Sequence, residues 1–283
     1  MKSNFRSFEF AILCTFFTTF VAYRIIAVVQ RKKTIKEPSR RRNEKKKSSV
    51  LSTSVVHHVV RHFVTGNFIP QRVFLPDKEY GLALDALVKA CSDVLVLSSD
   101  GDKILLGKRK VEPQPDWWFI GGRAKPGDTT RDAASRNVKR ELGLDLSVDR
   151  FCVIATYSMV WRWRAQAPAE NGTADISTVH TLQLTAEEQA QVKLDMNEYA
   201  NSAYVSFEDI LSGNYHPCLK QAVRDLLKQR ALDDLIQCAA TDKSSSISEI
   251  AASAMTFVAM HKAGIGEKES TKVHFLKGRY TCT

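Results

Sequence analysis

Cysteine is scarce in this sequence of 283 residues, which contains six cysteines far apart from one another. No two of them have the C-x-x-C spacing, and none is arranged like a zinc site. Six cysteines in a chain of this length are also too few for a disulfide-stapled scaffold. We therefore expect reduced, partly buried thiols in a reducing compartment, with a single disulfide as the open alternative. The cysteines are Cys14, Cys91, Cys152, Cys218, Cys238 and Cys282.

Excess positive charge is absent from most of the chain, although the net charge is +10. Residues 1–50 contain 13 lysines and arginines against 3 acidic residues, and the rest contains 28 of each sign. The basicity therefore belongs to one N-terminal arm, and the remainder is neutral. The high isoelectric point is therefore no evidence for a nucleic-acid-binding fold. We expect no nucleic-acid partner.

The N-terminal arm contains an apolar run from residue 10 to residue 29, which is long enough to cross a bilayer as a helix. Arg24 lies near its end, where a long side chain reaches the interface, and a dense basic cluster follows. The sequence predicts a membrane anchor in residues 1–30, in contact with membrane lipid, and a basic flexible linker in residues 31–60. The remainder would then be cytosolic. A cleaved signal peptide and an organelle-targeting arm are the alternatives.

Strand-like and helix-like patterns alternate between residues 61 and 237, which predicts an α/β domain. Residues 238–283 are expected to form a partly helical C-terminal extension with a polar tail. Thr129 and Asp132 form a capping box in front of a helix that Gly143 ends. Helices are expected at 80–90, 129–142, 206–211, 217–237 and 247–260, and strands at 93–97, 104–109, 117–120, 151–157 and 178–184, of which the first two form a hairpin.

The segment from Gly122 to Leu144, GRAKPGDTTRDAASRNVKRELGL, resembles the box of Nudix hydrolases. The spacing of that box is intact over 23 residues. The resemblance implies a Nudix-type α/β/α sandwich with a mixed sheet, preceded here by the N-terminal hydrophobic helix. The positions that match are Gly122, Arg136, Glu141, Gly143 and Leu144, whereas Asp128, Asn137 and Arg140 stand where the box has glutamates.

Carboxylates three and four residues apart share one face of a helix, where their oxygens suit Mg²⁺. Two of these positions carry no acid in this chain, so Glu141 is the carboxylate that remains on the face. We therefore expect a single Mg²⁺, neutralised mostly by the phosphates of the substrate, and no multi-metal site. Asp128 is expected to pair with Arg136 and not to ligate the metal.

The reduced box is similar to that of GDP-mannose mannosyl hydrolases, together with LLGKR at 105–109 and the aromatic–GGR run at 118–123. This resemblance implies that water attacks the anomeric carbon of a nucleoside-diphosphate sugar and that the nucleoside diphosphate leaves with Mg²⁺. Arg109 and Arg123 would bind the diphosphate, and Arg123 would stabilise the leaving group. The metal ligands would be Glu141, Glu198 and the carbonyl oxygen of Gly121.

In that branch the position of Tyr199 holds a histidine base, and tyrosine is a poor substitute because its ordinary pKa is near 10. His180 and His216 are the candidate replacements, and their alternatives are a strand residue and a helix cap. Trp161 and Trp163, beside Arg162 and Arg164, would stack on a base or sugar or else cover the sheet.

Three functions therefore stay open. The first is a Mg²⁺-dependent nucleotide-sugar hydrolase that cleaves at the sugar. The second is a Nudix pyrophosphohydrolase that cuts the diphosphate, and the third is a catalytically silent, nucleotide-sugar-binding Nudix protein. A homodimer is compatible with each of them.

Overall fold

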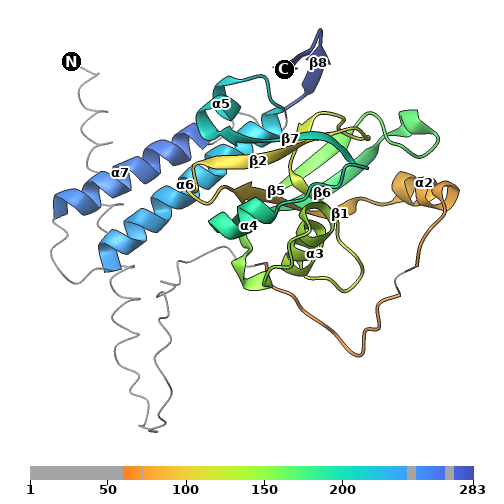
Figure 1. The fold of residues 1–283 in the computed structure, drawn as a ribbon, viewed down its shortest axis with the longest axis horizontal. Coiled ribbons are helices and arrows are strands. Elements are labelled where there is room, and N and C mark those ends of the chain that lie inside the picture. Colours follow the sequence, from red (N-terminus) through yellow and green to blue (C-terminus); the bar gives the residue numbers. More distant parts are fainter. Residues whose placement is uncertain (1–59, 72, 241–246, 265–270) are drawn as a thin grey trace, which may run out of the picture. The chain divides into compact units, whose positions relative to one another are not determined.

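The computed structural model describes residues 60–71, 73–240, 247–264 and 271–283 (Figure 1). Their chain divides into two compact units. The larger, which we call the sheet unit, contains the described residues of 60–230 and 259–283. The described residues of the smaller unit are 231–240, which end helix α6 (Pro217–Ala240), and 247–258, which form most of helix α7 (Ile247–Gly264).

A seven-stranded mixed sheet forms the centre of the sheet unit. Strand β1 pairs in parallel with β6 and antiparallel with β2, which confirms the predicted hairpin. β4 also pairs with β1, and β7 pairs with β2. The predicted α/β class with a mixed sheet is therefore confirmed. The strands are β1 Lys89–Leu97, β2 Lys103–Arg109, β3 Trp117–Trp118, β4 Ile120–Arg123, β5 Cys152–Trp161, β6 Thr173–Gln183 and β7 Tyr199–Ser206.

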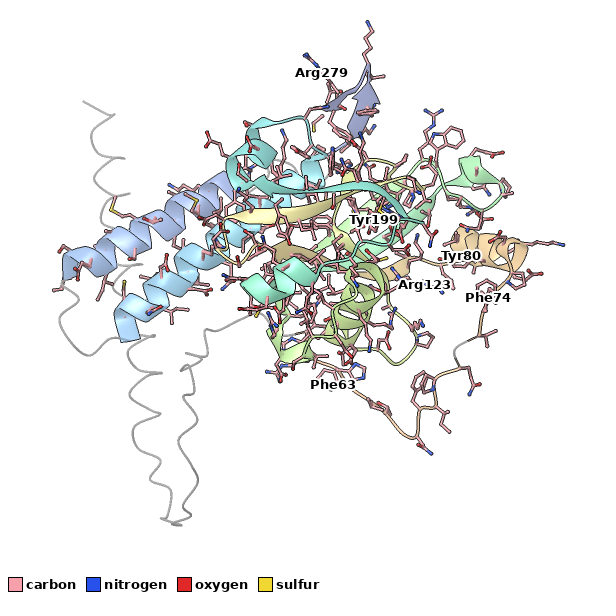
Figure 2. The ribbon with its side chains drawn as sticks, viewed as in Figure 1. Phe63, Phe74, Tyr80, Arg123, Tyr199 and Arg279 are labelled. Carbon is pink, nitrogen blue, oxygen red and sulfur yellow. The ribbon has the colours of Figure 1, made fainter. Side chains whose placement is uncertain are left out.

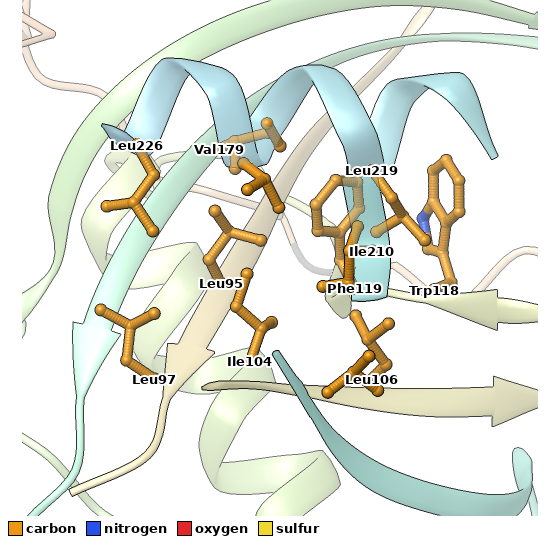
Figure 3. Close-up of a cluster of buried hydrophobic side chains, with 13 residues drawn as sticks. Leu95, Leu97, Ile104, Leu106, Trp118, Phe119, Val179, Ile210, Leu219 and Leu226 are labelled. Atoms are coloured by element: carbon orange, nitrogen blue, oxygen red, sulfur yellow. The ribbon is translucent and has the colours of Figure 1, made fainter. Parts of the chain in front are cut away.

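Each face of the sheet buries its own apolar cluster. Alternate residues of β1 point to opposite faces, because side chains alternate along a strand. Leu95 and Leu97 pack under α5 (Phe207–Ser212) and the first turns of α6, which Leu219 and Leu226 anchor (Figure 3). On the other face, Val94 and Val96 pack against α3 (Thr130–Leu142), through Ala134, Val138 and Leu142.

Helix α3 begins and ends as the sequence predicts. The Thr129 hydroxyl accepts from the backbone N–H of Asp132, and the Asp132 carboxylate accepts from the N–H of Thr129, so the capping box is confirmed. Gly143 ends the helix with a left-handed φ of 73°. The expected pairing of Arg136 with Asp128 is also present, at 2.9 Å.

Other elements differ from the sequence prediction. The helix expected at 80–90 is α2, Asp77–Ala86, and it ends early because Leu87 is already extended toward β1. The strand expected at 117–120 is divided between β3 and β4. Strand β7 and the short helix α4, Ala186–Gln191, were not predicted. Two turns of 3-10 helix, Val148–Arg150 and Ala169–Asn171, complete the connections.

The expected polar tail instead contains a β-hairpin, formed by β8 (Val273–Leu276) and β9 (Arg279–Cys282). Tyr280 attaches this hairpin to the sheet unit. Its hydroxyl donates to Asp116 Oδ2 at 2.8 Å and accepts from Gln114 Nε2 at 2.6 Å. Its backbone N–H donates to Asn214 Oδ1 at 2.9 Å, and its ring lies edge-on to that of His216.

Tyr280→Ala is expected to release this hairpin, because it removes the ring contact and both hydroxyl bonds. Two such bonds contribute about 1–3 kcal/mol, which corresponds to roughly tenfold or more in local opening. Limited digestion with trypsin, which cleaves after Lys277 and Arg279, measures this opening. Tyr280→Phe should give a smaller increase in cleavage rate. Equal cleavage rates in all three proteins would contradict the attachment.

No helix within the described ranges is long and apolar enough to span a bilayer. This finding corrects the predicted membrane-anchored localisation, and the segment proposed as the anchor, residues 10–29, lies outside the described residues. The described cysteines, Cys91, Cys152, Cys218, Cys238 and Cys282, are free thiols.

Candidate functional site

The site is assembled where β4 meets the last turn of α3. Glu141 projects from that turn and is fully buried, with 0% of its side chain exposed. Its Oε2 accepts from the hydroxyl of Tyr199 and, at 3.2 Å, from the backbone N–H of Gly121. Its Oε1 accepts from Nη2 of Arg140, which also lies 3.3 Å from the carbonyl oxygen of Gly121. Both oxygens of the carboxylate are therefore engaged by protein donors.

Burial dominates the electrostatics of Glu141. It raises the pKa of the carboxyl to about 7, because the charged form loses its hydration. The hydrogen bond from Tyr199 and the charge of Arg140 lower the pKa, whereas the charge of Glu198 raises it. The same burial, together with the charge of Glu141, raises the pKa of the Tyr199 hydroxyl, which therefore remains a proton donor to the carboxylate.

Asn137, which replaces a glutamate of the box, holds α3 to the sheet. Its amide donates to the carbonyl oxygens of Gly122 at 2.9 Å and Ser92 at 3.3 Å. Its own oxygen accepts from Arg136 Nη1 at 3.0 Å. The side chain is completely buried. Its role is therefore structural, since its donors and its acceptor are all engaged within the fold.

Strands β2 and β7 bring Arg109 and Glu198 together. The pairing of these strands is irregular at Lys108 and Arg109, and Arg109 Nη2 donates to Glu198 Oε1 at 3.0 Å. The ring of the next residue, Tyr199, lies against Gly107 of β2. A Cβ atom at Gly107 would overlap carbons of this ring. Arg109 Nε is buried without a hydrogen-bond partner in the described part of the chain.

The predicted metal ligands do not offer a cation site in this arrangement. Among the described residues, no group of three or more histidine, cysteine, aspartate or glutamate side chains is placed to hold a metal ion. Gly121 O and Glu141 are both contacted by Arg140, and Glu198 is paired with Arg109. An arginine thus contacts each of the three predicted ligands, and these residues as placed do not fit the ion.

Arg123 is the last residue of β4, and its side chain contacts helix α2. Its guanidinium lies over the ring of Tyr80 in α2, 4.9 Å from the centroid (Figure 2). The residue is exposed. Its backbone carbonyl oxygen accepts from Arg136 at 3.1 Å. Arg123 is therefore exposed and held by α2, and within the described ranges no contact joins its guanidinium to Glu141.

Of the two histidine candidates, His180 is buried and His216 is half-buried among protein groups. His180 is fully buried on the α3 face, with its nitrogens 3.4 Å from Asp93 O and 3.3 Å from Thr130 Oγ1. His216 accepts from the N–H of Cys218 at 3.1 Å, as a cap at the start of α6. Burial lowers both pKa values to about 4, so both rings are neutral at neutral pH. These positions give no support to the role of a general base.

A polar patch on the α6 face of the sheet was missed in the sequence. Trp161 Nε1 donates to Asp175 Oδ2 at 2.8 Å, and Lys89 Nζ lies 3.0 Å from Asp175 Oδ1. Next to them, Ser177 donates to Asp93 Oδ2 at 2.7 Å, and burial raises the pKa of Asp93 to about 6. The signal was present, because Asp175 and Ser177 are two residues apart and so share a face.

The two tryptophans proposed as a stacking surface have different surroundings. Trp161 packs edge-on against Trp118 and bonds Asp175, whereas Trp163 is 44% exposed beneath Arg162. Arg164 is buried and pairs with Asp85 at 2.7 Å. The stacking role of Trp161 and Trp163 stays a prediction.

Comparison with known proteins gives a family match. The family model of the NUDIX domain matches residues 89–226. A search of curated proteins finds no match. Similar solved structures include the MutT protein of Methanosarcina mazei Go1, with 18% identity and a TM-score of 0.38 over 52% of this chain and 93% of that one. The E. coli dihydroneopterin triphosphate pyrophosphohydrolase is 20% identical, with a TM-score of 0.38. The match covers 49% of this chain and 95% of that one. The C. elegans Ap4A hydrolase is 14% identical, with a TM-score of 0.35. The match covers 50% of this chain and 96% of that one.

Proposed function

We propose that residues 89–226, which the family model of the NUDIX domain matches, form a Nudix domain that binds a nucleoside-diphosphate sugar without Mg²⁺-dependent turnover. The family relationship supports the ligand class, and the form of the reduced box supports the sugar. The observation that carries the proposal is the buried carboxylate of Glu141, whose two oxygens both accept hydrogen bonds from the protein. A general Mg²⁺ site requires free oxygen ligands, and both oxygens of Glu141 are taken by Arg140, Tyr199 and the N–H of Gly121.

Two arginines support the binding of a diphosphate. Arg109 has a buried Nε without a partner in the described part of the chain, and a buried donor of this kind carries a desolvation cost that a ligand oxygen relieves. Arg123 presents an exposed guanidinium, held by stacking on Tyr80. A planar guanidinium matches phosphate oxygens with two parallel bonds. Each guanidinium therefore offers donors to phosphate oxygens.

A second candidate is the sugar-cleaving hydrolase that the box predicts. It is favoured by the proximity of two predicted ligands, because the charge of Glu198 is close enough to raise the pKa of Glu141. For a metal to reach these carboxylates, Arg140 and Arg109 would both have to move away. The hydrolase therefore requires a rearrangement of the site that binding alone does not.

The test uses the full chain with Mg²⁺ and a panel of GDP-, UDP- and ADP-sugars, followed by calorimetry and by phosphorus and proton NMR. We expect saturable binding of at least one sugar nucleotide and no product over hours. Release of nucleoside diphosphate and free sugar would instead establish the second candidate. Sugar phosphate with nucleoside monophosphate would establish a pyrophosphohydrolase, and absence of binding throughout the panel would refute the proposal.

Arg109→Gln is expected to weaken this binding about tenfold, since a charge-assisted hydrogen bond contributes about 1.5–3 kcal/mol. Lys108→Gln is the matched control, because it removes the same charge from the neighbouring residue of β2. Lys108 lies near the ring of Trp117, 5.9 Å from its centroid, and is exposed. Calorimetric titration compares the two. Equal losses in both variants would indicate a general effect of charge and would contradict a specific contact at Arg109.

A further inference from the structure

We infer that the guanidinium of Arg140 takes the place of a divalent cation in this site, so that phosphate groups are bound by a fixed arginine and not by a metal. The inference rests on the proposed function, because it names the group that meets the diphosphate. It differs from the loss of a metal site alone. A lost site leaves a buried carboxylate without a counter-charge, whereas here the counter-charge is part of the chain.

The position of one nitrogen carries the argument. Arg140 Nη2 contacts Glu141 Oε1 and lies 3.3 Å from the carbonyl oxygen of Gly121. These oxygens belong to two of the three groups that the sequence assigns to a metal. The third, Glu198, accepts from Arg109 at 3.0 Å. A positive nitrogen therefore lies against each predicted ligand, and the charge that the carboxylates need is supplied without an ion.

The backbone is shaped to admit this guanidinium. Gly122 has a φ of 154°, and a Cβ atom there would lie 3.2 Å from Arg140 Nη2. Any other residue would thus crowd the guanidinium or strain the backbone of β4. Asn137, also near Gly122, holds this strand against α3 by its bond to the Gly122 carbonyl oxygen. Gly122 of β4 and Asn137 of α3 therefore border the place in which Arg140 lies.

The remaining part of the guanidinium is available to a ligand. The Arg140 side chain is 48% exposed. Within the described ranges its Nε and Nη1 have no hydrogen-bond acceptor, because its contacts all go through Nη2. The Nη2 atom of the guanidinium is thus bound to the protein, and Nε and Nη1 can bind phosphate oxygens in two parallel hydrogen bonds. An arginine brings one positive charge, where Mg²⁺ would bring two, so it stabilises a leaving diphosphate less.

The competing explanation is that Arg140 serves only as the counter-ion of Glu141. In that case its removal would change stability but not the affinity for a diphosphate, once the buried charge is neutralised. Arg140→Gln combined with Glu141→Gln provides this condition, since the pair becomes neutral and keeps its shape. Lys139→Gln is the charge control, because Lys139 lies one residue away in a surface pair with Asp145.

The first experiment measures GDP and GDP-mannose affinity of the full chain in EDTA and in MgCl₂. For the wild type and Lys139→Gln we expect affinities that differ by less than about threefold between the two buffers. Arg140→Gln, and its combination with Glu141→Gln, should bind about tenfold more weakly in EDTA. Unchanged affinity in both variants, or a wild type that needs Mg²⁺, would overturn the inference.

The second experiment uses Mn²⁺ alone, observed by electron paramagnetic resonance, and needs no nucleotide. Arg140→Glu removes the guanidinium and adds a carboxylate, so this variant should bind one Mn²⁺ that is lost when Glu141→Gln is added. The wild type should bind none at this position. Glu141-dependent Mn²⁺ binding by the wild type would overturn the inference. If no protein in the set bound a nucleotide, the proposed function would fail, and the Mn²⁺ result would still decide what occupies the cation position.

Discussion

Gly107→Ala is expected to destabilise the sheet unit by about 2–6 kcal/mol and to expose Glu141. The added Cβ atom would overlap ring carbons of Tyr199, which is 1% exposed and has no space into which to withdraw. Overpacking of this kind costs about 1–3 kcal/mol. Displacement of the ring also removes the hydroxyl that donates to Glu141, and a buried carboxylate that loses a donor costs about 1–3 kcal/mol more.

Urea denaturation of the wild type, Gly107→Ala and Tyr199→Phe separates these two causes. Tyr199→Phe keeps the ring over Gly107 and removes only the hydroxyl, so it should cost about 1–3 kcal/mol. Adding Tyr199→Leu to Gly107→Ala relieves the overlap, and the two substitutions together should cost at least about 1 kcal/mol less than their sum. Simple additivity would show that the alanine acts elsewhere, and Gly107 would then have no part in positioning Tyr199.

Local patterns in the sequence predicted the framework of the site because they depend on neighbours along the chain. The capping box of Thr129 and Asp132 fixes the start of α3, and the glycine after Leu142 fixes its end. The same locality places Glu141 on the last turn. The turn at Ser98–Asp102 likewise joins two apolar strands, so the hairpin of β1 and β2 could be predicted.

Contacts between distant residues could not be predicted in this way. Glu141 and Tyr199 are 58 residues apart, and Gln114 and Tyr280 are 166 apart, so no periodicity links them. Six of the eight residues of strand β7 are exposed or half-buried, and three of these six are asparagine or serine, so the strand lacks the apolar alternation that identifies a strand. The replacement of a glutamate by Arg140 was visible in the sequence. Its contact with both Gly121 and Glu141 depends on the approach of β4 to the last turn of α3, which the sequence does not specify.

Between pH 6.5 and pH 4.5 the unfolding free energy of the wild type is expected to change little, because four buried groups oppose one another. Burial lowers the pKa of His180 and His216 to about 4, so the unfolded chain binds their protons first and acid destabilises the fold. Burial raises the pKa of Glu141 to about 7 and that of Asp93 to about 6. The folded chain binds those protons first, and acid stabilises it.

Single substitutions should therefore give opposite slopes. Glu141→Gln removes a carboxyl that takes up a proton in the folded chain within this window. The unfolding free energy should therefore fall by about 1.4 kcal/mol per pH unit as the pH decreases. His180→Gln removes an imidazole that takes up a proton only in the unfolded chain within this window. The unfolding free energy should therefore rise by a similar amount per pH unit as the pH decreases. Urea denaturation at pH 6.5, 5.5 and 4.5 measures both slopes, with Lys139→Gln as the control that leaves the wild-type slope unchanged. The difference between slopes is the relevant quantity, because it does not depend on how much each substitution costs at neutral pH. If Glu141→Gln kept the wild-type slope, the carboxyl would titrate alike in both states, and its burial beneath Arg140 and Tyr199 would not hold in solution.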